Sequence, residues 1–197
     1  EQEQVHIARR FSGGGAVYHD LGNINLTFIE TAPRLPEFVT YLQRTLDFLN
    51  SIGLMAKGGE RLGIYLNGLK ISGSAQCVHK NRVLYHCTLL YDTDLTALHK
   101  ALNPEPMVDD ETLSSVYAVP SVRSEVTNIR SYLPEGTVTD FKEKAFQYFS
   151  KSQSVSAFTG KEIEAVNQLR EGKYIQKSGY IVVDVRAGFV SIRLKFT

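Results

Sequence analysis

The sequence predicts an α+β fold in which mixed, mainly antiparallel sheets pack against helices. Short segments with alternating apolar residues indicate strands, and longer segments with apolar residues at helical spacing indicate helices. The two kinds of element follow each other without the regular strand–helix–strand alternation of a doubly wound sheet. A chain of 197 residues is long enough to bury one large core, alone or with a small appended domain.

A glycine loop between two strands, followed by a helix, is expected in the first fifty residues. Alternating apolar residues predict strands at 5–8 and 23–28, on either side of Gly13-Gly14-Gly15. Pro36 favours the start of a helix, and apolar residues then recur at helical spacing until Gly53 ends the pattern.

Two antiparallel hairpins are expected next. Asn67-Gly68 between alternating apolar positions predicts a two-residue turn, and this turn sets Lys70 opposite Tyr65. A second pair of strands, Ile71–His79 and Val83–Leu90, is joined by a short polar turn.

The second half of the chain is expected to contain three helices, a long loop and a final hairpin. The expected elements are a helix capped by Asp94, a solvated loop over 103–120, a helix beginning at Thr139, a helix after the capping box Thr159-Gly160-Lys161-Glu162, and a hairpin of residues 180–185 and 189–196.

Charge and hydropathy argue against nucleic acids and membranes as partners. The formal net charge is +1 and no run of five basic residues occurs, so the chain lacks the basic field that drives nucleic-acid binding. The longest stretch without a charged residue is the 11 residues Thr112–Val122, well short of the ~20 that cross a bilayer. Cys77 and Cys87 lie about three positions out of register, so they are expected to stay reduced, as in the cytoplasm or, in a eukaryote, the mitochondrion.

Most familiar catalytic and metal-binding motifs are absent. The sequence contains no P-loop, no nucleophile elbow and no pair of histidines four residues apart, so it predicts no metal site. The acidic run Asp92-Thr93-Asp94 is compatible with a metal ligand set, but a turn that ends in a helix cap is the favoured interpretation.

Two segments are suited to bind an anion. Arg10, at the end of a strand and next to the glycine loop, offers a guanidinium fork beside exposed backbone N–H groups, a combination that suits phosphate. A plain tight turn is the alternative. Lys70 is followed by Ser72-Gly73-Ser74-Ala75, whose small side chains leave room for a ligand beside an ammonium group, and a lysine that simply faces solvent is the alternative.

These two segments together resemble the lipoate–protein ligase family. Arg9-Arg10-Phe11-Ser12-Gly13-Gly14-Gly15-Ala16-Val17-Tyr18-His19-Asp20-Leu21-Gly22-Asn23 is similar to the signature loop of that family, and Lys70-Ile71-Ser72-Gly73-Ser74-Ala75 is similar to the segment with its catalytic lysine. Further similarity at residues 85–90, 121–128 and 173–174 extends the resemblance over almost the whole chain.

The resemblance implies a catalytic domain like that of class II synthetases and biotin ligases, and a reaction in two steps. Lipoate and ATP, with Mg²⁺, would give lipoyl-AMP and pyrophosphate. The acyl group would then pass to a lysine of a lipoyl carrier domain in a 2-oxoacid dehydrogenase complex or in the glycine cleavage H protein. By the same resemblance Lys70 would be the catalytic lysine and touch both ATP and lipoate. The implied nucleotide contacts are Arg10, Gly15, Ala16, Val17, Tyr18 and Lys70.

The resemblance also implies a domain division. Residues 1–176 would form the catalytic domain without its N-terminal strands, and residues 177–197 would be part of a small C-terminal accessory domain. Cys87 stands where many members of the family have Gly, and Glu125 stands where Arg is common. These departures bear on recognition of the carrier domain more than on activation of the acid.

Two other functions stay open at this point. A lipoyl or octanoyl transferase of the same fold would use a cysteine nucleophile, so Cys77 and Cys87 are candidates, with buried structural thiols as the alternative. A protein that binds lipoate or lipoyl-AMP without catalysis is the other.

Overall fold

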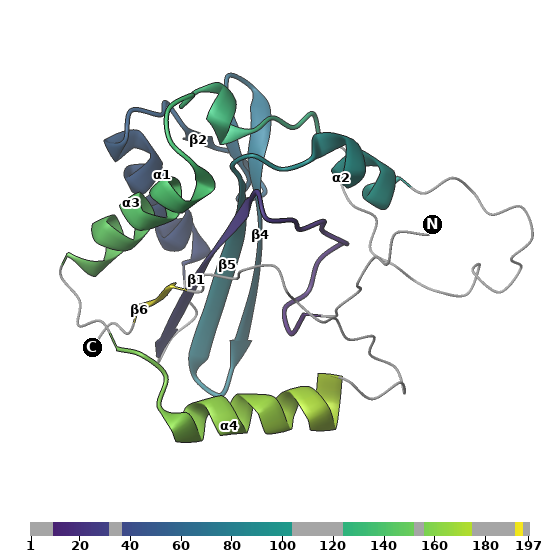
Figure 1. Cartoon of the computed structure of the whole chain (residues 1–197), viewed down its shortest axis with the longest axis vertical. Helices are drawn as coiled ribbons and strands as arrows, with labels where there is room; N and C mark the ends of the chain where they lie inside the picture. Colours follow the sequence, from purple (N-terminus) through teal and green to yellow (C-terminus); the bar gives the residue numbers. More distant parts are fainter. Residues whose placement is uncertain (1–9, 32–36, 104–123, 152–155, 175–191, 195–197) are drawn as a thin grey trace, which may run out of the picture.

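The computed structural model of the chain describes residues 10–31, 37–103, 124–151, 156–174 and 192–194 (Figure 1). Its helices and strands are β1 (Asn23–Thr31), α1 (Phe38–Ser51), β2 (Lys57–Gly58), β3 (Ile64–Leu66), β4 (Leu69–His79), β5 (Arg82–Leu90), α2 (Leu95–Leu102), a 3₁₀ turn (Ile129–Ser131), α3 (Val138–Ser150), α4 (Gly160–Leu169), a π-helical turn (Arg170–Tyr174) and β6 (Ile192–Leu194). No helix within these ranges has the length and apolar character needed to cross a bilayer.

The strands form one sheet in the order β2-β3-β4-β5-β1-β6. Each adjacent pair is antiparallel except β1 and β6, which run parallel. The predicted α+β class with a mainly antiparallel sheet is therefore confirmed. The predicted strand at 5–8, the loop over 103–120 and most of the final hairpin lie outside the described residues, while β6 adds Ile192–Leu194 to the edge of the sheet beside β1.

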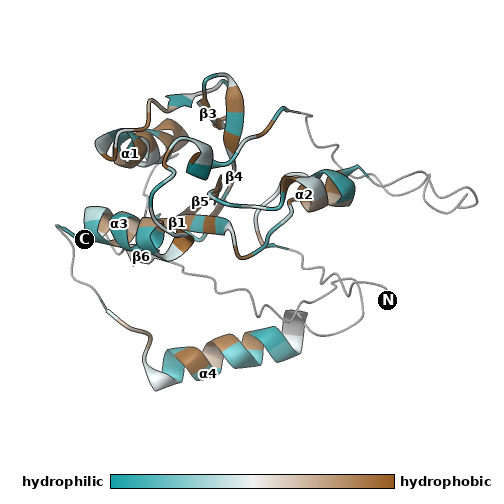
Figure 2. Cartoon of the chain, turned by 45° about the horizontal axis from the view of Figure 1, so that its top comes forward, coloured by the Kyte–Doolittle hydropathy of each residue, from teal (hydrophilic) through white to brown (hydrophobic). Residues whose placement is uncertain are grey.

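One face of the sheet carries the core, and helices α1 and α3 cover it (Figures 1 and 2). Tyr41 of α1 stacks on Tyr85 of β5, with ring centroids 5.5 Å apart. Phe149 of α3 meets Phe28 of β1 edge to face at 5.6 Å. Burial of each such ring contributes about 2 to 3 kcal/mol relative to an exposed side chain, so this aromatic cluster anchors both helices to the sheet.

Both predicted hairpins are present, and the two central residues of each turn have positive φ. Asn67 and Gly68 have φ of 49° and 83°, which is the conformation that a two-residue turn of this type requires. Lys80 and Asn81 turn the β4–β5 hairpin in the same way, with φ of 47° and 59°. The pairing of Tyr65 with Lys70 is as expected.

The helix caps are confirmed with one correction. The Asp94 carboxylate accepts the backbone N–H groups of Thr96 and Ala97 at the start of α2. Helix α3, expected to begin at Thr139, begins one residue earlier, because Thr137 and Asp140 form a reciprocal capping box that fixes Thr137 as the N-cap.

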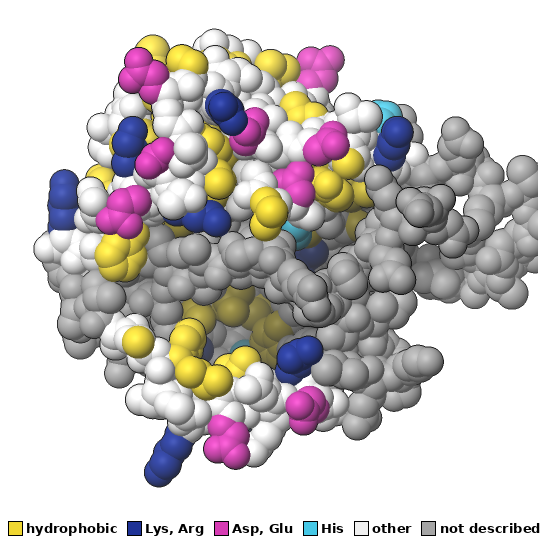
Figure 3. All heavy atoms as spheres, viewed as in Figure 1, with side chains coloured by type: hydrophobic (Ala, Val, Ile, Leu, Met, Phe, Trp, Pro, Cys, Tyr) yellow, Lys and Arg dark blue, Asp and Glu magenta, His cyan; other side chains and the backbone are white. Residues whose placement is uncertain are grey.

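Helix α4 lies apart from the core. It has the predicted capping box between Thr159 and Glu162, but every one of its residues is exposed. Apolar side chains at Ile163, Val166 and Leu169 are about half exposed, and apolar side chains gather on α4 in the space-filling view (Figure 3).

Candidate functional site

The second face of the sheet carries small and polar side chains, and we call it the loop-side face. His86 and Thr88 on β5 alternate with the buried Tyr85 and Cys87, so they point away from the core. Gly73 and Ala75 are their partners on β4, and Asn25 and Thr27 are their partners on β1. A Cβ built on Gly73 meets no atom within 4 Å, so the space above this part of the face is open.

The glycine loop begins on this face, beside β4 in Figure 1. The buried Ser12 places its Oγ 2.6 Å from Nε2 of His86. Burial lowers the pKa of His86, and the nearby positive charges of Arg10 and His19 lower it further. A largely neutral imidazole therefore holds the start of the loop.

Arg10 shapes the loop from within. Its guanidinium donates hydrogen bonds to the carbonyl oxygens of Gly13 and Gly15, at 2.8 Å in each case. Gly14, between them, has φ of +106°, and a Cβ there would lie 2.6 Å from Nη2 of Arg10. Gly14 therefore lets the backbone fold around the arginine side chain. Burial lowers the pKa of Arg10.

The far end of the loop is clamped to the corner between β5 and α2. The Asp20 carboxylate accepts the backbone N–H groups of Gly22 and Asp94 at 2.8 Å. The Gly22 carbonyl accepts the N–H groups of Tyr91 and Asp92, and a Cβ on Gly22 would lie 2.1 Å from the Asp92 carbonyl oxygen. This half of the signature loop has a structural role.

The acidic run after β5 belongs to the same corner. Asp92 pairs with Arg130, and Asp94 caps α2. The interpretation as a turn and helix cap is therefore confirmed, and among the described residues no group of three or more His, Cys, Asp or Glu side chains is placed to hold a metal ion.

A β-bulge puts Lys70 on the loop-side face. Ile64 pairs with Ser72, whereas the next residue, Tyr65, pairs with Lys70, so Ile71 is an extra residue on β4. Ile64 and Ser72 are buried on the core face. Tyr65 and Lys70 form the next pair, so they lie on the opposite face, where both are half-buried.

The backbone of Lys70 is held on both sides. Its N–H donates to the Glu125 carbonyl at 2.8 Å, and its carbonyl accepts the N–H of Thr127 at 3.0 Å, in addition to its pairing with Tyr65. Burial lowers the pKa of Lys70, and the positive charge of Arg61 lowers it further. The backbone hydrogen bonds thus fix the position from which the Lys70 side chain extends, near the end of the sheet.

The structure does not bring Arg10 and Lys70 into contact. His86, beside Arg10, pairs with Ala75, which is five residues along β4 from Lys70. Because Ile71 is an extra residue, the two places are four ladder steps apart, or about 14 Å at about 3.4 Å per step. The glycine loop covers the same span, because Gly22 at its far end binds Tyr91, which directly follows β5. The predicted contacts Ala16 and Val17 are exposed, and Gly15 and Tyr18 are half-buried.

Three residues of this region were not assigned by sequence reasoning: Ser12, His86 and Arg61. Ser12 and His86 are 74 residues apart, and nothing local predicts that they meet. Arg61 precedes β3, the strand that pairs with Lys70. Only the register of this hairpin could have indicated that Arg61 lies near Lys70.

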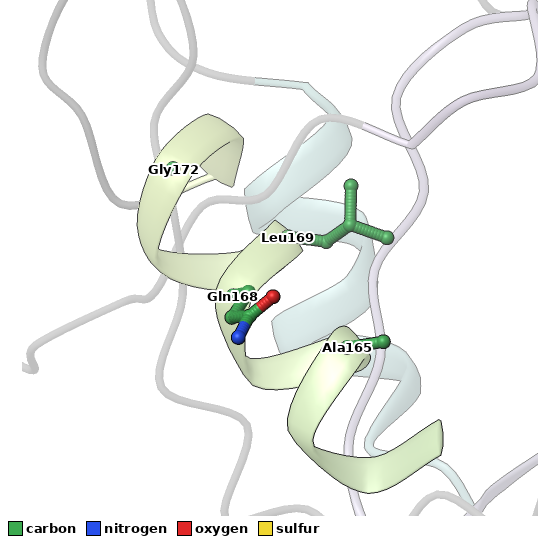
Figure 4. A pocket seen from close by; sticks show the side chains of 4 residues that line it. All are labelled: Ala165, Gln168, Leu169 and Gly172. Atoms are coloured by element: carbon green, nitrogen blue, oxygen red, sulfur yellow. The ribbon is translucent and has the colours of Figure 1, made fainter. Parts of the chain in front are cut away.

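A pocket of about 370 Å³ lies elsewhere, on the surface of α4 and the turn that follows it. Ala165, Gln168, Leu169 and Gly172 line it (Figure 4). None of the predicted site residues borders it.

A sheet with one helix-covered face and one face of small, polar and cationic residues is typical of a ligand-binding α+β domain. Comparison with known families makes the assignment specific. Residues 1–150 match the family model of the lipoyl protein ligase A/B catalytic domain, and the chain belongs to that family.

Individual relatives agree with this assignment. The chain is 39% identical over 156 residues to a probable lipoate-protein ligase A of Mycoplasma pneumoniae, covering 78% of this chain and 44% of that protein. It is 31% identical over 182 residues to the lipoate-protein ligase LplJ of Bacillus subtilis, covering 88% and 54%. The chain thus spans about half the length of these curated relatives.

Solved structures show the same fold. A bipartite lipoate protein ligase of Thermoplasma acidophilum, described with its E2 lipoyl domain, superimposes with a TM-score of 0.67 at 27% identity, over 86% of this chain and 68% of that one. A lipoate-protein ligase A bound with ATP superimposes with a TM-score of 0.69 at 24% identity, over 86% and 69%.

Proposed function

We propose that this protein is an ATP-dependent lipoate–protein ligase. It activates lipoate to lipoyl-AMP on the loop-side face of the sheet and then transfers the lipoyl group to a lysine of a carrier domain. The observation that carries the proposal is that the glycine loop and β4 extend over the same length of the loop-side face. The contact between Ser12 and His86 lies at one end of that length and Lys70 lies at the other.

That span suits a long, extended ligand. A molecule that reaches from the start of the glycine loop to Lys70 must extend for about 14 Å along the strand. ATP and lipoyl-AMP are elongated molecules of about that size, whereas a small acid alone would reach one end only. The bulge at Ile71 supports the proposal, because it turns the only lysine of β4 toward the loop-side face.

Lys70 has the position and charge to serve the first step. A carboxylate oxygen of lipoate attacks the α-phosphorus of ATP, a new O–P bond forms, and pyrophosphate leaves with the electrons of the broken P–O bond. The two reactants are both anions, and a cation between them offsets their repulsion and the charge of the transition state. The fixed backbone of Lys70 keeps that cation in place.

The loop positions the nucleotide. Because the guanidinium of Arg10 already binds Gly13 and Gly15, we assign Arg10 the role of shaping the loop whose exposed residues Ala16 and Val17 meet the nucleotide. This differs from the direct phosphate contact that the sequence suggested for Arg10. In the second step the amine of the carrier lysine attacks the acyl carbon and AMP leaves.

The described residues do not form a protein-built site for Mg²⁺. The carboxylate of Asp20 accepts backbone N–H groups through both oxygens, and no group of three or more His, Cys, Asp or Glu side chains in the described part of the chain is placed to hold a metal ion. No step above is therefore assigned to a metal held by side chains.

The transferase alternative is less well supported. Burial raises the pKa of Cys77, and it raises the pKa of Cys87 to about 11. A nucleophilic cysteine needs a lowered pKa or an adjacent base. Cys87 is wholly buried on the core face, so an acyl donor cannot reach it.

The experiment is exchange of labelled pyrophosphate into ATP by the protein. Exchange that requires lipoate supports adenylate formation, and subsequent labelling of a lipoyl domain supports the second step. Binding of a lipoyl-AMP analogue without exchange would indicate a non-catalytic protein. Acyl transfer without ATP from an acylated carrier would indicate a transferase.

A further inference from the structure

A tight turn connects β2 to β3 and carries Arg61. The N–H of Gly59 donates to the Gly63 carbonyl at 2.8 Å, and the N–H of Leu62 donates to the Gly59 carbonyl at 3.0 Å. Leu62 has φ of 57°, in the left-handed region that bulky residues rarely adopt. These contacts fix the path of the backbone on both sides of Arg61.

The turn packs directly against Lys70. A Cβ built on Gly63 would lie 3.3 Å from Cε of Lys70 and 3.2 Å from the hydroxyl of Tyr65. The lysine side chain therefore runs over the backbone of Gly63, two residues from Arg61. The mutual repulsion of the two side chains is strong enough to contribute to the lowered pKa of Lys70.

Neither of these two cations forms an ion pair within the described part of the chain. The ion pairs found there are Arg44–Glu30 and Arg130–Asp92, both away from this turn. Two neighbouring cations without a counter-charge are unfavourable in the free protein, and an anion of more than one charge relieves the repulsion.

We propose that Arg61 is a second cation of the Lys70 site and binds the β- and γ-phosphates of ATP, which leave as pyrophosphate. This inference rests on the proposed ligase function. Arg61 is exposed whereas Lys70 is half-buried, which suits a contact with the part of the nucleotide that must depart. The guanidinium fork can bind two phosphate oxygens at once, whereas Lys70 acts on the reacting centre.

The test is calorimetric titration of the protein with ATP, pyrophosphate and AMP. Arg61→Ala is expected to weaken ATP and pyrophosphate binding about tenfold, since a hydrogen-bonded charge pair contributes at least that much. AMP lacks the two outer phosphates, so its affinity is expected to stay within about twofold. Arg61→Lys is expected to restore part of the loss.

Arg82→Ala is the matched control. Arg82 is also exposed, and it lies at the other end of β4 and β5, so its loss removes the same charge at a distance. It is expected to bind all three ligands as the parent does. Equal losses for ATP and AMP in Arg61→Ala, or no loss for either, would overturn the inference while leaving the ligase function intact. A parent protein that binds neither ATP nor pyrophosphate would overturn both.

Discussion

Ser12 Oγ and His86 Nε2 lie 2.6 Å apart, and this contact joins the start of the glycine loop to β5. A neutral ring with an unprotonated Nε2 accepts the serine O–H, whereas a protonated ring donates its Nε2–H to the serine oxygen. The donor and the acceptor of this contact therefore exchange when His86 gains a proton, and burial of the ring opposes that charge.

Acidification is expected to destabilise the protein through His86. Its pKa in the folded state lies below the ordinary value of 6.5, because of burial and then the charges of Arg10 and His19. The unfolded state thus binds the proton more readily, and the free energy of unfolding falls as the pH drops below 6.5. Urea unfolding from about pH 7.5 to about pH 5 measures this, and His86→Gln is expected to flatten the slope. Parallel slopes for parent and variant would contradict the link.

Gly22→Ala is expected to destabilise the protein by about 3 kcal/mol or to prevent folding. The added Cβ would lie 2.1 Å from the carbonyl oxygen of Asp92, and a backbone atom cannot move aside cheaply. Gly13→Ala is the matched control, since a Cβ there meets nothing within 4 Å and φ is not positive. Thermal unfolding of both variants tests this. A lower midpoint for Gly22→Ala alone supports the structural role of Gly22, and equal midpoints would contradict it.

Lys70→Ala is expected to abolish lipoate-dependent pyrophosphate exchange and to change stability by no more than about 1 kcal/mol. The side chain is half-buried at a sheet end, and truncation leaves its backbone bonds in place. Lys70→Arg is expected to fail as well, because a planar guanidinium cannot replace a compact ammonium between two anions. Exchange at the parent rate in Lys70→Ala would remove Lys70 from the mechanism.

The two cysteines are expected to affect stability and not catalysis. Cys87→Ala removes a fully buried side chain and is expected to cost about 1 to 2 kcal/mol. Cys77→Ala, at a half-buried position, is expected to be nearly neutral. Both variants should lipoylate a carrier within a few-fold of the parent. Capture of an acyl group on Cys77, seen by mass spectrometry together with loss of transfer, would favour the transferase.

Local sequence signals predicted much of the fold. The dipeptide Asn67-Gly68 predicted a two-residue turn, and a turn of this length fixes which residues pair on either side of it. The pairing of Tyr65 with Lys70 could therefore be predicted. The capping box at Thr159 is equally local, and the start of α3 was predicted one residue late because the capping box at Thr137 was not recognised.

The arrangement of the site was harder to predict from the sequence. The face on which Lys70 lies depends on the extra residue at Ile71, and a bulge becomes visible only when the partner strand is known. The sequence suggested Arg10 as a ligand contact but did not show that its guanidinium also donates to the carbonyls of Gly13 and Gly15, because that depends on the path of the loop backbone. His86 sits in an ordinary alternating strand, so its contact with Ser12 comes from the tertiary fold alone.

The bulge in β4 divides this strand into two segments that are out of phase. On one side of Ile71, even-numbered positions such as Ser72 face the core, and on the other side Lys70, also even-numbered, faces away from it. Removal of a single residue here would put the segments back in phase and turn Lys70 toward the core face of the sheet. One inserted residue thus determines on which face of the sheet the side chain of Lys70 lies.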